Sequence, residues 1–246
     1  MSPDSRQHRG PHPSDKQLFH YQNVPALREA TADLSWLLTR GYAMKSSLKL
    51  VGDHQSLKER QRLAVARAAC SDSQLEHRIA TCVQPEKVIG EELAIDGFNL
   101  LITLEAALSG GVLILGRDGC IRDLSGVHGS YRSVTETDRA IGLTGKALES
   151  LGVRTARWLL DKPISNSGRL AQRIRERALE HRWLWEVEVV FNPDSEIMSE
   201  DRIAVSSDSI ILDRATRWFN LSRYIVEQFL LQSWVVDIRF HSEASE

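Results

Sequence analysis

Residues 93–99 read LAIDGFN, and this stretch decides how the rest of the chain is interpreted. Apolar residues run directly into Asp96, which is followed by Gly97, an aromatic residue and Asn99. Aspartate is uncommon inside strands, and an unpaired carboxylate is costly to bury. The pattern therefore predicts a buried strand that ends at a carboxylate, with a turn or helix beginning directly after it.

The composition is that of an ordinary globular protein: 246 residues, 42% of them hydrophobic and 26% charged, with a net charge of -2. This length allows one large domain, or a domain with a smaller helical part. The small net charge gives no overall field that attracts nucleic acid or membrane, although a local basic face is compatible with it. Three isolated cysteines and the lack of a long apolar run predict a cytoplasmic protein with no membrane partner.

Three segments of the chain differ in composition and in the spacing of their apolar residues. Residues 1–24 are rich in proline, serine and charge, and are expected to form a disordered tail. Residues 25–84 place apolar side chains at helical spacing and predict a helical annex. Residues 85–246 alternate between strand-like and helix-like segments, with a hairpin turn at 118–119. Such alternation favours an α/β domain with a largely parallel sheet and helices on both faces.

Aspartates end several of the predicted strands. LAID ends at Asp96, WLLD at Asp161 and AVSSD at Asp208. Ligands of open α/β sheets bind outside the carboxyl ends of the strands, so these side chains are expected to converge there. Carboxylate and amide oxygens suit Mg²⁺ or Mn²⁺, which predicts Asp96, Asp208 and Asp161 as metal ligands with Asn99 close by. Capping of the following helices is the alternative role for these aspartates.

Two further acidic residues are assigned structural roles. Asp194 follows Pro193 at the end of VVFNPD, and turn chemistry explains it. Glu105 lies on the helix predicted after LAID and is expected on a solvated face of that helix.

A substrate surface is predicted from a different part of the chain. The stretch ISNSG at 164–168 opens an arginine-rich helix, and its serines and asparagine are expected to cap that helix. Free amides at a helix start can also hold a phosphate, and nearby basic side chains can follow a phosphate backbone. The predicted substrate-binding residues are Ser165, Asn166, Ser167, Arg169, Arg173 and Lys45. A solvated helix face is the alternative for the arginines.

Two motifs, IDGFN and AVSSDS, resemble those of the PIN-like nucleases and, within them, the NYN branch. The chain as a whole also resembles an uncharacterised prokaryotic family, through RGYAMKSSLKLVGD, RQRLAVARAACSD and DKPISNSGRLA. The nuclease resemblance implies a Rossmann-like sheet and an acidic site that uses Mg²⁺ or Mn²⁺ to hydrolyse phosphodiester bonds, usually in RNA. By motif, Asp96, Asn99 and Asp208 would be catalytic, and Asp161 would join them by its position at a strand end.

One departure from the nuclease pattern keeps other functions open. Ser209 follows Asp208 where the family has a second aspartate close behind the first. The leading prediction is a metal-dependent ribonuclease with RNA as its partner. A catalytically inactive RNA- or nucleotide-binding module, or a metal-dependent phosphatase, is the alternative. The sequence leaves open whether the annex binds substrate, covers the sheet or forms a homodimer.

Overall fold

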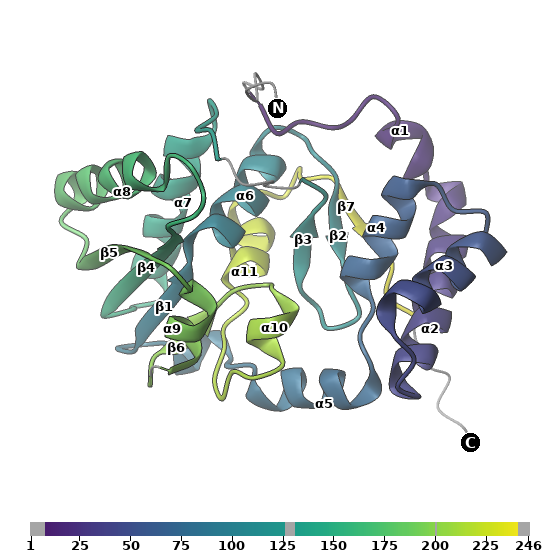
Figure 1. Ribbon diagram of the computed structural model, residues 1–246. Helices are drawn as coiled ribbons and strands as arrows, with labels where there is room; N and C mark the ends of the chain where they lie inside the picture. The colour runs from purple at the N-terminus through teal and green to yellow at the C-terminus, as the bar shows by residue number, and fades with distance from the viewer. Residues whose placement is uncertain (1–7, 126–130, 200, 241–246) are drawn as a thin grey trace.

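The computed structural model describes residues 8–125, 131–199 and 201–240, which form two sheets with helices around and between them (Figure 1). Sheet A has four parallel strands in the order β5–β4–β1–β6: β1 (Glu92–Asp96), β4 (Thr155–Asp161), β5 (Trp185–Val190) and β6 (Ile203–Val205). Sheet B has three strands in the order β3–β2–β7: β2 (Leu113–Leu115), β3 (Ile121–Asp123) and β7 (Val235–Asp237). The predicted largely parallel sheet is thus present as sheet A.

Helices occupy most of residues 8–81, and helices alternate with strands afterwards. The helices are α1 (Asp15–Leu18), α2 (Val24–Thr39), α3 (Met44–His54), α4 (Glu59–Ala68), α5 (Asp72–Thr81), α6 (Gly97–Leu108), α7 (Thr137–Ser150), α8 (Ser167–His181), α9 (Pro193–Ser199), α10 (Ser209–Leu212) and α11 (Leu221–Phe229), with short 3-10 turns at Tyr21–Asn23 and Pro85–Lys87. Within the described residues, none of these helices has the length and apolar character needed to cross a membrane.

The β1–α6 unit explains the residues of LAIDGFN. The interior residues of β1 are fully buried, because β1 lies between β4 and β6 in the sheet. Helix α6 then begins directly at Gly97. A Cβ atom at that position would lie 2.6 Å from a methyl group of Leu160 and 3.2 Å from the carbonyl oxygen of Leu159. Glycine therefore permits the close approach of α6 to β4.

Helix α6 lies between the two sheets and contacts β1 and β4 on one side and β2 and β3 on the other (Figure 1). It is apolar almost all round, as expected of a helix that is covered on every side. The prediction that Glu105 faces solvent is therefore wrong. Its fully buried carboxylate accepts hydrogen bonds from Arg9 at 2.5 Å, from Tyr131 at 2.5 Å and from Thr137 at 2.6 Å.

Helices α2, α3 and α4 of the annex pack against sheet B, away from sheet A (Figure 1). Leu27, Leu34 and Val65 share one buried cluster with Ile114 of β2 and Val236 of β7. The hydrophobic core of the annex is therefore completed by strands that lie far along the chain.

The prediction of a disordered tail over residues 1–24 does not hold for residues 8–24. Arg9 is buried against Glu105, and the buried carboxylate of Asp15 pairs with Arg60 at 2.6 Å. Buried ion pairs with two later elements hold this segment on the fold, which its polar composition does not reveal. Residues 1–7 lie outside the described residues.

The pairing of strands places the predicted hairpin and the segment that follows β6. The hairpin around residues 118–119 is confirmed, and its strand β2 pairs with β3 on one side and with β7 on the other, in sheet B and not in sheet A. Helix α10, which follows β6, covers only Ser209–Leu212. The chain beyond it passes through turns and bends to Trp218, which forms a parallel bridge with Ala204 of β6.

Candidate functional site

The carboxyl ends of β1 and β6 lie side by side, since Ile95 is paired with Val205. The chain runs from β1 outward to β4 and β5, and then returns to β6 on the other side of β1. Ligands of open parallel sheets bind outside the strand ends at such a reversal of strand order. Asp96 closes β1 at this point, and the loop Ser206–Asp208 leaves β6 there.

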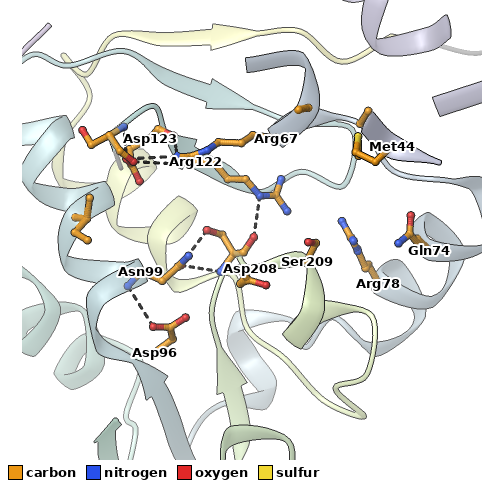
Figure 2. A pocket seen from close by; sticks show the side chains of 15 residues that line it. Met44, Arg67, Gln74, Arg78, Asp96, Asn99, Arg122, Asp123, Asp208 and Ser209 are labelled. Carbon is orange, nitrogen blue, oxygen red and sulfur yellow. Dashed lines mark hydrogen bonds and ion pairs between the residues drawn. The ribbon is translucent and has the colours of Figure 1, made fainter. Parts of the chain in front are cut away.

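Hydrogen bonds fix this loop against the end of β1 (Figure 2). The side chain of Asp96 accepts the N–H of Asn99 at 3.2 Å and the hydroxyl of Ser206 at 2.9 Å. The Oδ1 atom of Asn99 accepts both the N–H and the O–H of Ser207 at 2.9 Å. The Ser206 hydroxyl also accepts the N–H of Asp208 at 3.0 Å. Asn99 therefore positions the loop, with its amide oxygen already occupied by two donors.

Carboxylates around this point influence one another. Desolvation is the main cause that raises the pKa of Asp96 to about 7, with a further contribution from the charges of Asp194 and Asp208, against the two hydrogen bonds that lower it. Desolvation and the charges of Asp208 and Asp161 likewise raise the pKa of Asp194. A cation placed among these groups would relieve their mutual repulsion.

Asp161 lies at the end of β4, farther from the reversal point. Desolvation raises the pKa of its carboxyl, and its Oδ1 is buried without a hydrogen-bond partner among the described residues. In residues 8–125, 131–199 and 201–240, no three His, Cys, Asp or Glu side chains come together as a group that could hold a metal ion. The predicted three-aspartate site is therefore not brought together as a cage.

A pocket of about 450 Å³ opens beside Asp96 and Asp208 (Figure 2). Its walls come from the ends of sheet A, from the β2–β3 hairpin and from the annex helices. The lining residues are Met44, Ala66, Arg67, Ala69, Gln74, Arg78, Asp96, Asn99, Ile102, Arg122, Asp123, Ser125, Ser207, Asp208 and Ser209. The predicted site residues Asp96, Asn99 and Asp208 thus share one polar pocket.

The six predicted substrate-binding residues are all described by the structure, and none of them lines this pocket. They are Lys45, Ser165, Asn166, Ser167, Arg169 and Arg173. The predicted side-chain capping of α8 is also wrong. Asn166 takes a left-handed backbone conformation with φ of 69° and donates its amide to the carbonyl of Tyr131 at 2.8 Å. Arg173 pairs with Asp138 at 2.6 Å and so connects α8 to α7.

The sequence analysis missed several residues of this site. Asp194 was assigned to a turn, although it lies in the first turn of helix α9 and its charge acts on Asp96. The arginines of the pocket, Arg67, Arg78 and Arg122, come from segments far from the aspartates in sequence. No spacing in the sequence relates them to Asp96, because only the packing of the annex and of sheet B beside sheet A brings them there.

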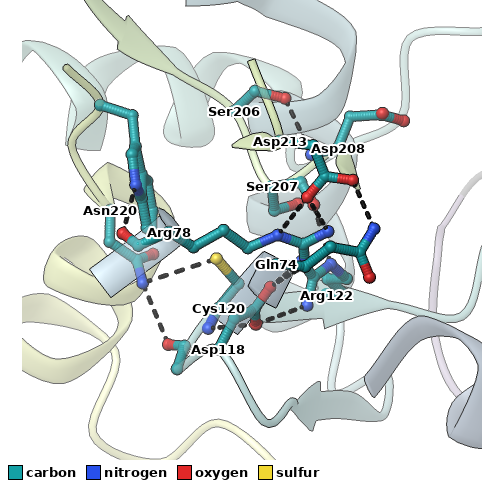
Figure 3. A network of polar contacts seen from close by, with 12 residues as sticks. Gln74, Arg78, Asp118, Cys120, Arg122, Ser206, Ser207, Asp208, Asp213 and Asn220 are labelled. Atoms are coloured by element: carbon teal, nitrogen blue, oxygen red, sulfur yellow. Dashed lines mark hydrogen bonds and ion pairs between the residues drawn. The ribbon is translucent and has the colours of Figure 1, made fainter. Parts of the chain in front are cut away.

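A buried ion-pair network holds the segment that follows β6 (Figure 3). Arg122 donates to the carbonyl oxygen of Ser207 at 2.8 Å and pairs with Asp118 at 2.6 Å. Asp118 also pairs with Arg78 at 2.6 Å, and Arg78 pairs with Asp213 at 2.6 Å. Burial alone would raise the pKa of Asp118, but the two arginines outweigh it and hold that pKa well below its usual range. Asp118 therefore does more than form its Asp-Gly turn.

Comparison with known proteins gives the family of the chain. Residues 85–224 match the family described as Domain of unknown function (DUF5616), and residues 26–80 match the one described as Protein of unknown function (DUF434). The chain belongs to the DUF5616 family. It is 32% identical over 187 residues to an uncharacterised protein of Methanocaldococcus jannaschii, a match that covers 76% of this chain and 89% of that protein. No solved structure matches the chain.

The family assignment confirms the predicted resemblance to an uncharacterised family. It also divides the pocket into two parts. Arg67 and Arg78 come from the DUF434 region, whereas Asp96 and Asp208 come from the DUF5616 region. The candidate site is therefore composite, with each region supplying one wall.

Proposed function

We propose that this DUF5616 protein is a metal-dependent nuclease that hydrolyses phosphodiester bonds in RNA, and that sheet A belongs to a PIN-like, Rossmann-like domain. The observation that supports the proposal is the mutual effect of Asp96, Asp194 and Asp208 at the reversal of strand order. Like charges held this close are unfavourable unless a cation neutralises them. Helix capping alone explains Asp96 and Asp208 singly but gives no reason for placing both of them beside one polar pocket.

The donor set fits a hard divalent cation. Mg²⁺ usually keeps several waters and binds through one or two carboxylates together with substrate phosphates, so a cage of three protein ligands is not required. Asp96 and Asp208 would hold the ion, with Asp161 and Asp194 adding negative charge at its outer side. Each Asp96 oxygen accepts one hydrogen bond and retains acceptor capacity. A bound ion of this kind lowers the pKa of a water and polarises a phosphoryl oxygen.

Hydrogen bonds within and around the loop position Asp96 and Asp208 for binding the ion. The Ser206 hydroxyl links the Asp96 carboxylate to the backbone N–H of Asp208 and so fixes the distance between the two aspartates. Asn99 holds Ser207 from the first turn of α6. Because these bonds are already made, the two carboxylates are oriented before substrate arrives.

The proposal is tested with labelled single-stranded RNA in Mn²⁺, in Mg²⁺ and in chelator. We expect metal-dependent cleavage that falls by at least about 100-fold in Asp96→Asn and Asp208→Asn, beyond the roughly 10- to 100-fold cost of losing an outer-sphere partner. The matched control is Asp53→Asn, an exposed annex aspartate paired with Arg62, which should cleave like the parent. Cleavage that persists in chelator, or in both site variants, would overturn the proposal.

A specific observation also favours a second candidate, an inactive RNA- or nucleotide-binding module. Asp96 and Asp208 both cap helices, Asp96 through Asn99 and Asp208 through the N–H of Ile210 at 2.7 Å. Metal-independent RNA binding without cleavage would favour this candidate. Hydrolysis of mononucleotides with intact RNA would instead favour a phosphatase.

A further inference from the structure

The three arginines of the pocket differ in the charge that they can offer to a ligand. The side chains of Arg78 and Arg122 are only 3% and 9% exposed, and both lie 2.6 Å from Asp118. Arg78 also pairs with Asp213. Two aspartates thus balance two arginines, and this network is occupied in holding the loop after β6.

Arg67 is held differently. Its side chain is 30% exposed and projects from α4 into the pocket. Its Nη1 atom donates to the carbonyl oxygen of Asp123, and its Nη2 atom donates to that of Ser125 at 3.1 Å. The same Nη1 atom lies 3.5 Å from the Asp123 carboxylate, a longer ion pair than the 2.6 Å pairs of Arg78 and Arg122. The Nε–H of Arg67 makes no hydrogen bond with any residue that the structure describes. The guanidinium is therefore fixed in orientation while one edge stays open to the pocket.

The position of Arg67 suits an anionic ligand. It lines the pocket from the annex wall, whereas Asp96 and Asp208 line it from the ends of sheet A. The guanidinium fork matches the oxygens of a phosphate, and a guanidinium that is already oriented loses little entropy on binding. Apolar surface from Met44 and Ile102 lies in the same pocket, where a sugar or base could rest.

We propose that Arg67 binds a phosphate of single-stranded RNA, so that the DUF434 region supplies the substrate-binding cation of a site whose carboxylates come from the DUF5616 region. The inference rests on the proposed nuclease function and names how that site holds its substrate. The pocket volume of about 450 Å³ has room for about one nucleotide and not for a duplex. Single-stranded RNA is therefore the substrate form that fits.

The test measures binding separately from cleavage. Anisotropy of a labelled single-stranded RNA is followed in Ca²⁺ at several salt concentrations, with gels to confirm that the RNA stays intact. We expect Arg67→Gln to weaken binding about tenfold or more and to reduce the salt dependence by about one phosphate contact. Arg67→Lys keeps the charge but not the two-pronged guanidinium geometry, so its affinity for RNA should lie between those of the parent and of Arg67→Gln.

The matched control is Arg154→Gln. Arg154 is an exposed arginine that pairs with Glu92 at 2.7 Å, at the opposite end of sheet A. The Arg154→Gln variant should bind RNA with the same affinity as the parent. Because Arg67→Gln also loses two bonds to backbone carbonyls, the unmodified protein is tested as well. Bound RNA should protect Arg67 from phenylglyoxal, with the modified residue mapped by mass spectrometry.

The outcomes separate this inference from the proposed function. Binding that depends on Arg67 without metal-dependent cleavage would retain the phosphate site and remove the nuclease. Cleavage with unchanged binding by Arg67→Gln, and no protection of Arg67, would retain the nuclease and overturn the inference. Failure of the unmodified protein to bind single-stranded RNA at low salt would also overturn it.

Discussion

Some interactions of Asp96 favour its ionised form, and others favour its protonated form. As the N-cap of α6 it accepts a backbone N–H, which favours the ionised form. Desolvation and two neighbouring carboxylates favour the protonated form and outweigh the cap, so the pKa rises to about 7. The free protein therefore holds a carboxyl that is ready to exchange its proton for a cation near neutral pH.

This raised pKa predicts how stability depends on pH. Because the folded pKa of about 7 exceeds the ordinary value of 3.8, the contribution of Asp96 is fully present below pH ~4 and is lost as the pH rises through 7. In chelator, Asp96→Asn should therefore gain stability relative to the parent between pH 5 and pH 8. Urea unfolding at a series of pH values measures this, with Asp53→Asn as the control. A constant difference between parent and variant across that range would contradict the assignment.

Glu105 gives a second prediction at the scale of a single residue. Glu105→Gln leaves the buried Arg9 without its counter-charge, and breaking a buried pair costs about 3–5 kcal/mol. Urea unfolding should show this loss in the free energy of unfolding. Glu180→Gln, which removes an exposed partner of Arg177, should change it by less than about 0.5 kcal/mol. Equal effects of the two substitutions would show that the Arg9 pair does not hold the N-terminal segment.

Among the elements, the junction of β1 and α6 positions the site. The helix starts without a connecting loop, so the N-cap aspartate is also the last residue of the strand. Residues 206–208 then bind to that junction through Asn99 and Asp96. A displacement of α6 would therefore move both Asp96 and the loop that contains Asp208.

Gly97→Ala tests this junction. The added methyl group meets the side chain of Leu160 and the backbone oxygen of Leu159, and overpacking of this kind costs about 1–3 kcal/mol. Thermal or urea unfolding measures the loss. Gly142→Ala in α7 is the matched control, because its Cβ would meet no atom within 4 Å. That substitution should stabilise the protein by about 0.5–1 kcal/mol.

At the scale of the whole molecule, the two family regions share one hydrophobic core. The annex helices bury their apolar faces on β2 and β7, and β7 lies near the end of the chain. Arg78 of the annex also pairs with Asp118 of the hairpin and with Asp213. The site and the core therefore both extend across the boundary between the two regions.

Separation of the regions should consequently abolish stable folding. A fragment of residues 85–240 exposes the apolar face of sheet B and leaves Asp118 facing one arginine instead of two. We expect this fragment to lack a cooperative thermal transition by circular dichroism, and coexpression with residues 8–84 to restore it. A soluble fragment with cooperative unfolding on its own would show that the DUF5616 region is an independent domain.

The sequence by itself determined the local structure. Apolar runs predicted β1, β4, β5 and β6, the sequence also predicted helices at α6 and α8, and the Asp-Gly pair predicted the hairpin. Strand ends also pointed to Asp96 and Asp208, since the carboxyl ends of parallel strands share one edge of a sheet. These features depend on periodicity and chain geometry, which are read from neighbouring residues.

Only the tertiary structure decided which distant residues meet. It placed Arg67, Arg78 and Arg122 opposite the aspartates, buried Glu105 against Arg9, and separated sheet B from sheet A. The type of a charged residue does not tell whether its side chain is exposed to solvent or buried in an ion pair. Sequence spacing therefore does not reveal its partner. Helical spacing in the sequence predicted the annex. Its position as one wall of the pocket follows from the apolar core that it shares with β2 and β7.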